Sequence, residues 1–177
     1  MLDSIKVNLK LPYIGSIEGV WKPNRSERQA AWDMYVELAT RVTVVHLGPD
    51  EGMLREALNS LHSLFSTTRE VLKKYGPSVA QVSKKNGVSF AFLAVSILNL
   101  RLRPVLAKWH PMLLDYEGKR PQGVSPAEHE RAWDKNVELR GILAEVRESL
   151  VAYANILAKV AMVPALIGDI PQSNRKA

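Results

Sequence analysis

The sequence predicts an all-α fold: an antiparallel bundle of four to five helices preceded by a short extended, β-like arm. Apolar residues recur at helical spacing in long segments that Gly and Pro separate. Strict alternation of polar and apolar residues is confined to the N-terminus. The 177 residues suffice for one domain with a sizeable core. We therefore divide the chain into an extended arm (1–22), a helical bundle domain (23–168) and a flexible tail (169–177).

The N-terminal arm has the period of a half-buried strand. Residues 4–11 carry Ile, Val or Leu at every second position, and Pro12 ends the run. A second short extended run, 17–21, follows Gly15. Because a lone strand leaves backbone donors and acceptors unpaired, the arm must fold on itself as a hairpin, lie along the helices or pair with another chain.

The first two helices are separated by a Gly-Pro-Asp turn. The first is expected from Asn24 or Ser26 to about Leu47, and the second from a cap at Asp50 to Gly76. The second helix is the most strongly patterned stretch of the chain. The predicted inner face of the first helix consists of Trp32, Tyr35, Val36, Ala39 and Val42.

The remaining helices follow a short predicted helix over 78–85. Residues 88–100 are apolar or small almost throughout and are too few to span a bilayer, so we expect a buried central helix that Pro104 kinks or ends. The last helix begins with a capping box formed by Ser125 and Glu128 and runs without a break to Pro164.

An eight-residue phrase occurs twice, as residues 31–38 and 132–139, with six positions identical. On a helix, its Trp and Val share one face and its Asp and Glu share the next. We therefore expect Trp32 and Trp133 to pack in a common interior while the acidic neighbours point outward. A metal site would need those acids, Asp33, Glu37, Asp134 and Glu138, to gather inside. Ferritin-like bundles also use Glu-x-x-His, which this sequence lacks, so we expect no metal or cofactor.

Basic charge is concentrated in one segment. Residues 69–108 contain eight Lys or Arg side chains against a single acid, Glu70, within a chain whose net charge is +6. Such a segment either complements acidic faces of the same fold or attracts nucleic acid, anionic lipid or an acidic partner. Glu130, Asp134 and Glu138 recur every four residues. Because like charges at that spacing repel one another on a helix, we expect a basic surface opposite them. The candidate nucleic-acid contacts are Lys73, Lys74, Lys84, Lys85, Arg101 and Arg103.

Catalytic signatures are absent from the sequence. It has no phosphate-binding glycine loop, no nucleophile elbow, no His-Glu-x-x-His and no cysteine. The four histidines are scattered, and we expect His46 and His110 to be structural. Enzymatic activity is therefore not expected.

The leading hypothesis is a non-catalytic protein–protein interaction module, an adaptor or accessory subunit that binds a protein partner or a second copy of itself. The overall character resembles small cytosolic bacterial helical proteins that act as subunits or adaptors. The lack of cysteine and of a signal-peptide core at residues 1–10 indicates the cytoplasm. The candidate partner-binding residues are Ile5, Val7 and Leu9, through strand addition, and Glu130, Asp134 and Glu138.

Three alternatives remain open at this point. The first is a nucleic-acid-binding accessory protein that uses residues 69–108, whose binding falls steeply with salt. The second is a membrane-active protein in which residues 88–100 and 149–168 form a releasable apolar hairpin. The third is a bundle that binds metal through carboxylates.

Overall fold

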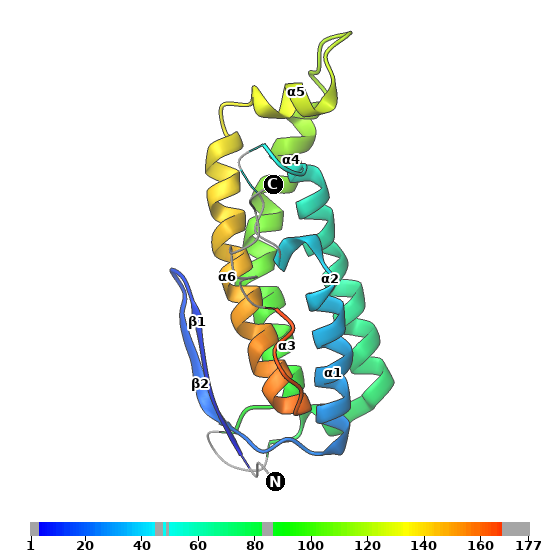
Figure 1. Cartoon of the computed structure of the whole chain (residues 1–177), viewed down its shortest axis with the longest axis vertical. Helices are drawn as coiled ribbons and strands as arrows, with labels where there is room; N and C mark the ends of the chain where they lie inside the picture. Colours follow the sequence, from blue (N-terminus) through cyan, green and yellow to red (C-terminus); the bar gives the residue numbers. More distant parts are fainter. Residues whose placement is uncertain (1–3, 45–47, 49, 83–86, 168–177) are drawn as a thin grey trace, which may run out of the picture.

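The computed structural model describes residues 4–44, 48, 50–82 and 87–167, and these form a mostly helical fold with one β-hairpin (Figure 1). The strands and helices in chain order are β1 (Ile5–Leu11), β2 (Gly15–Trp21), α1 (Arg25–Ala39), α2 (Leu54–Tyr75), α3 (Phe90–Ser96), α4 (Arg103–Glu117), α5 (Pro126–Arg131) and α6 (Asn136–Ala161). Three short helical turns complete it: η1 (Val42–Val44), η2 (Gly76–Ala80) and η3 (Ile97–Leu102).

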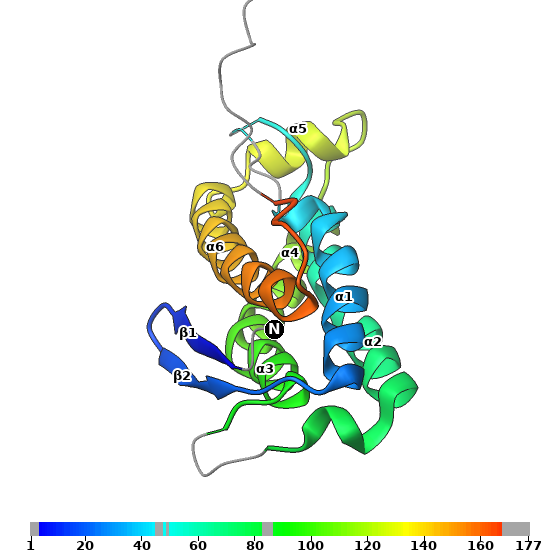
Figure 2. The same ribbon diagram turned by 60° about the horizontal axis from the view of Figure 1, so that its bottom comes forward.

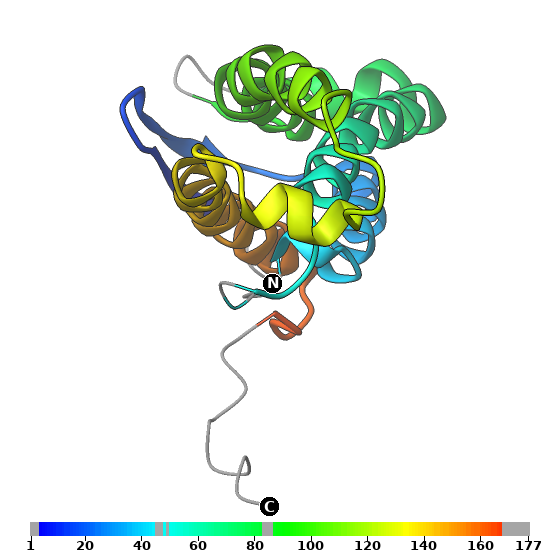
Figure 3. The ribbon, with the colours of Figure 1, turned by 90° about the horizontal axis from the view of Figure 1, so that it is seen from above.

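The long helices run side by side along the long axis. Helix α1 packs against both α6 and α2, and α2 packs against α4, as the view from above shows (Figure 3). The hairpin lies along α6, and α5 crosses the upper end of the molecule (Figure 1). The buried apolar side chains form one core cluster that the hairpin and all the long helices share.

The N-terminal arm folds on itself as a hairpin and also lies along α6, so two of the three arrangements expected for it are observed. Strands β1 and β2 pair antiparallel, with Ile5 opposite Trp21 and Leu11 opposite Gly15. The alternating apolar side chains of β1 are buried in the core, where β1 packs against α6. In the turn, the N–H of Ile14 donates to the carbonyl of Leu11 (3.0 Å), and Gly15 has φ +130°, which favours glycine.

A buried carboxylate, Glu27, joins three elements near the start of α1. It accepts hydrogen bonds from the indole N–H of Trp21 (3.0 Å), the backbone N–H of Asn24 (2.9 Å) and the backbone N–H of Phe90 (3.1 Å). The side-chain oxygen of Asn24 in turn accepts from the backbone N–H of Glu27 (2.9 Å), which completes a capping box. Burial raises the pKa of the Glu27 carboxyl, and these donors oppose that rise.

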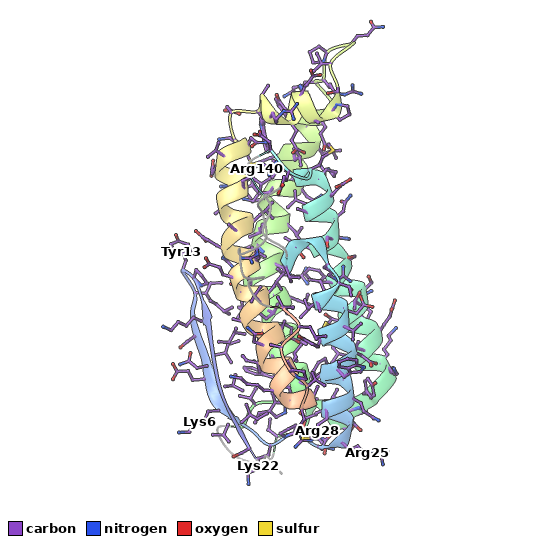
Figure 4. All side chains as sticks on the ribbon, viewed as in Figure 1. Lys6, Tyr13, Lys22, Arg25, Arg28 and Arg140 are labelled. Atoms are coloured by element: carbon purple, nitrogen blue, oxygen red, sulfur yellow. The ribbon has the colours of Figure 1, made fainter. Side chains whose placement is uncertain are left out.

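The first turn of α2 is capped from a distance, so the predicted cap at Asp50 is wrong. Met53 occupies the cap position and provides no side-chain bond. Both carboxylate oxygens of the buried Glu130 accept from the backbone N–H of Leu54 at 3.0 Å. Arg140 of α6 donates to the carbonyls of Glu51 (3.1 Å) and Gly52 (3.3 Å) and lies near the upper end of the fold (Figure 4). The segment before α2 is thus held by the last third of the chain.

Residues 90–117 form one continuous helical stretch, although Pro104 was expected to kink or end it. The turn η3 before Pro104 is π-helical, and the N–H of Arg103 bonds to the carbonyl of Leu98, five residues back. A proline cannot donate to the carbonyl four residues before it, and a π turn is a common way to accommodate such a defect. This stretch is long and apolar enough to cross a membrane (mean hydropathy 1.6), and half of its apolar segment is buried inside the fold.

The two copies of the repeated phrase have different structures, so the prediction of a common interior is wrong. Trp32 is 43% exposed in the middle of α1, whereas Trp133 is 7% exposed. Trp133 lies in a break between α5 and α6 and stacks on Tyr116, with 5.4 Å between ring centroids. Val36 and Val137, the other apolar members, are both exposed. Tyr35 of the predicted inner face is buried as expected, and the other buried apolar residues of α1 are Ala30, Ala31, Met34 and Leu38.

The remaining boundary predictions differ in detail. Helix α1 ends at Ala39 rather than near Leu47, and the last predicted helix is two helices, α5 and α6. The short helix expected over 78–85 appears as the turn η2. The side chain of Val42, and residues 45–47 with His46, lie outside the described part, as do residues 83–86 and 168–177.

Replacing Glu27 with Ala should lower the free energy of unfolding by about 3 kcal/mol, because three donors around one buried site lose their acceptor. Urea denaturation followed by circular dichroism measures the change. Glu37→Ala is the matched control on the same helix, since Glu37 is exposed and only pairs with Arg41. Equal effects of the two substitutions would contradict the structural role of Glu27.

The two tryptophans of the repeat should respond unequally to truncation. Trp133→Ala should cost about 3 to 5 kcal/mol because it empties a buried aromatic site. Trp32→Ala should cost about 1 kcal/mol or less because much of that ring is already in water. Thermal and urea unfolding compare the pair, and similar losses would indicate that the repeats are equivalent after all.

Candidate binding groove between α2 and α4

A solvent-open cavity of about 550 Å³ lies between α2 and α4, and we call it the α2–α4 groove. Helix α2 has a strongly amphipathic pattern whose apolar side packs on the core, so one flank of the helix remains to line the groove. Helix α4 provides the opposite wall. The lining residues are Asn59, His62, Phe65, Arg103, Leu106, Ala107 and His110.

At the upper end of the α2–α4 groove, polar contacts join α2 to α4. Arg55 of α2 pairs with Glu117 of α4 (2.8 Å) and also donates to Nδ1 of His110 (2.7 Å). Since an arginine only donates, Nδ1 of His110 accepts, and the ring proton of neutral His110 sits on Nε2. Burial, then the charges of Arg55 and His62, lower the pKa of His110, so the ring is neutral at pH 7.

The middle of the α2–α4 groove combines aromatic and cationic groups. The guanidinium of Arg103 lies 5.0 Å from the centre of the Phe65 ring, and its Nε donates to Asn99 (3.1 Å). The rings of His62 and His110 are 5.7 Å apart and meet edge to face. No carboxylate is among the lining residues, which combine the buried Leu106 and the half-buried Phe65 with the exposed, charged Arg103.

The positive and apolar character extends beyond the lining residues. On α2, His62, Ser66 and Arg69 are exposed and share one stripe, because they are four and three residues apart. On the opposite helical stretch, Leu100 is 42% and Leu114 is 65% exposed.

The lining of the α2–α4 groove provides aromatic, aliphatic, amide, imidazole and guanidinium groups, and no Ser, Cys, Asp or Glu is among these residues. Within the described ranges, no group of three or more His, Asp or Glu side chains is placed to hold a metal ion.

The residues predicted to bind a partner do not form one surface. The side chains of Ile5, Val7 and Leu9 are buried within the chain itself. Glu130 is buried as the cap of α2, Asp134 is exposed, and Glu138 pairs with Lys108 (3.5 Å) and Lys135 (3.8 Å). Strand addition would therefore use the backbone edge of the hairpin, because these three side chains are covered, and partner binding by this set stays a prediction.

The residues predicted to bind nucleic acid are also dispersed. Arg101 is buried and pairs with Glu145 of α6 (3.3 Å), so it is not available at the surface. Lys74 pairs with Asp33 (2.6 Å), Lys73 is exposed and Arg103 lines the α2–α4 groove. Lys84 and Lys85 lie outside the described residues.

The four acids of the repeat are separated. Asp33 accepts from Lys74 and from the hydroxyl of Tyr75 (2.7 Å), and Glu37 pairs with Arg41 on its own helix (3.0 Å). Glu138 pairs with Lys108 and Lys135. The repeat therefore supplies surface pairs rather than one cluster of carboxylates.

Sequence reasoning missed His62, Phe65 and Arg55 as candidate site residues. The apolar pattern of α2 shows which side of the helix faces the core. It could therefore have indicated that His62 and Phe65 lie at the edge of that side. The pairing of Arg55 with Glu117 spans 62 residues, and no local pattern indicates it.

Comparison with known proteins finds no relative of this chain. No model of a known protein family, no curated protein and no solved structure matches it.

The protonation of His110 should appear in the pH dependence of stability. Because its pKa in the folded state is below that of the unfolded chain, the unfolded chain takes up more protons as the pH falls. The contribution of neutral His110 is thus fully present above about pH 6.5 and is lost as the pH falls through the lowered pKa. Urea unfolding at stepped pH, compared with His110→Asn, tests this. An unchanged pH slope in the variant would contradict it.

Proposed function

We propose that this chain is a non-catalytic helical interaction module that binds a segment of a partner protein in the α2–α4 groove. In this proposal the long helices form an antiparallel bundle that keeps α2 and α4 in register through Arg55, His110 and Glu117. The observation that carries the proposal is a cavity lined by apolar and aromatic side chains and by the cation Arg103, without an acid in its lining.

The occupant that fits the α2–α4 groove is an amphipathic helix carrying carboxylates beside its apolar face. Helix-in-groove binding uses apolar anchors one helical turn apart. Phe65, Leu106 and Ala107 offer the surface for such anchors. Arg103 stands where a partner carboxylate would be paired, and its charge disfavours the binding of a basic helix. The volume suits a few anchoring side chains rather than a whole domain.

Nucleic acid is the weaker candidate for this surface. Nucleic-acid binding would rely on clustered surface cations. Because Arg101 is buried and Lys74 pairs with Asp33, fewer free surface cations remain than the sequence suggests.

A synthetic amphipathic helix of Leu, Ala and Glu should bind the wild-type chain, and Arg103→Glu should weaken that binding about tenfold or more. The physical reason is that reversal of the rim charge replaces an attraction with a repulsion. Fluorescence anisotropy of the labelled peptide gives the dissociation constant, and amide chemical shifts identify the surface that it contacts.

Two controls make the result decisive. Arg131→Glu carries the same charge change at an exposed site on α5, away from the lining residues, and should leave the affinity unchanged at moderate salt. A scrambled peptide of equal composition removes the apolar face and should bind weakly. Equal binding of both peptides, or shifts confined to another face, would refute the proposal.

A further inference from the structure

A second surface, distinct from the α2–α4 groove, gathers basic side chains at one end of the molecule. This is the end where α1 and α3 begin and where α2 and α6 finish (Figure 2). Figure 4 shows Lys6, Lys22, Arg25 and Arg28 together at this lower end. We define the basic pole as Lys6, Lys22, Arg25, Arg28, Lys73 and Lys159.

Direct contacts bring these six residues to one end. Asn24, the residue before Arg25, donates to the carbonyl of Ser78 (2.8 Å), which joins the start of α1 to the turn after Lys73. Arg28 donates to the carbonyl of Val160 (3.0 Å), next to Lys159 in the last turn of α6. Lys6 lies opposite Val20, close to the end of β2 from which Lys22 continues.

Few acids offset the charge of the basic pole. Glu27 is buried and engaged by three donors, and Asp33 pairs with Lys74. In the part of the chain that the structure describes, the exposed carboxylates on the same strands and helix ends are Glu18, which accepts from Ser16, and Glu70, one turn before Lys73. The pole therefore presents a clear excess of positive charge to a large anionic surface.

Exposed apolar side chains accompany the cations. Four of them belong to segments that meet at this end: β2, the residues after η2, the first turn of α3 and the residue after α6. They are between 42% and 57% exposed, and they are Val20, Val82, Phe92 and Met162. Nucleic-acid backbones are bound through polar contacts and would leave these side chains in water. A lipid interface attracts the cations and also takes up apolar side chains.

We propose that the basic pole docks this protein peripherally on an anionic lipid bilayer. The long axis would then stand away from the membrane, and the α2–α4 groove would face the surrounding water along most of its length. No helix inserts across the bilayer in this proposal, so the half-buried stretch from Phe90 to Glu117 keeps its place in the core.

Co-sedimentation of the full chain with phosphatidylcholine vesicles containing about 30% phosphatidylserine tests the proposal. The protein should sediment with these vesicles and not with pure phosphatidylcholine, and salt should weaken the binding. Each cation near an anionic bilayer adds about a fivefold gain in binding, so the triple variant Lys6→Gln, Lys22→Gln and Arg25→Gln should bind about 100-fold more weakly. Phe92→Gln should weaken the binding that persists at higher salt.

The matched control removes the same charge far from the basic pole. The triple variant Lys119→Gln, Arg131→Gln and Lys135→Gln should retain most of the vesicle binding. If the first triple variant does not fold, Lys73→Gln with Lys159→Gln should still reduce binding about 25-fold, by the same gain per cation. No binding at low salt, equal losses in both triple variants, or tighter binding to duplex DNA than to vesicles would each overturn the proposal. Arg103→Glu lies in the α2–α4 groove and should leave vesicle binding largely intact, so the two proposals fail separately.

Discussion

The placement of the elements depends on one buried carboxylate, Glu27. Its two oxygens satisfy donors from the end of β2, the start of α1 and the start of α3, which are three separate parts of the chain. A buried charge is costly unless donors surround it, and the three hydrogen bonds lower that cost. The same geometry brings the hairpin and two helix N-termini to one end, where the basic pole lies.

At the opposite end of the molecule, the buried Glu130 accepts from the start of α2 in a similar way. Because both acids are used inside the fold, the positions of acidic residues in the sequence are a poor guide to a binding surface. Each provides a helix start with an acceptor, where the positive end of the helix dipole favours a negative group. The line Glu130, Asp134 and Glu138 is therefore not one edge, because its first member is buried and its helix breaks at Trp133.

The sequence predicted the elements better than their faces. Alternation in residues 4–11 and the capping box at Ser125 located a strand and a helix start, because both signals are local. The face of α1 was misassigned because Trp32 and Val36 weigh heavily in a hydrophobic pattern, whereas small Ala31 and flexible Met34 fill the interior. The α2–α4 groove could not be predicted, since Arg55 finds His110 and Glu117 only after both helices pack.

The remote cap of α2 also has a consequence for biosynthesis. The carboxylate that receives the N–H of Leu54 comes 76 residues later in the chain, and Arg140, which holds the preceding carbonyls, comes later still. While the nascent polypeptide emerges from the ribosome, α2 has no such acceptor until α5 has been translated. Its first turn therefore frays in the newborn chain and becomes ordered only when the C-terminal third docks on it.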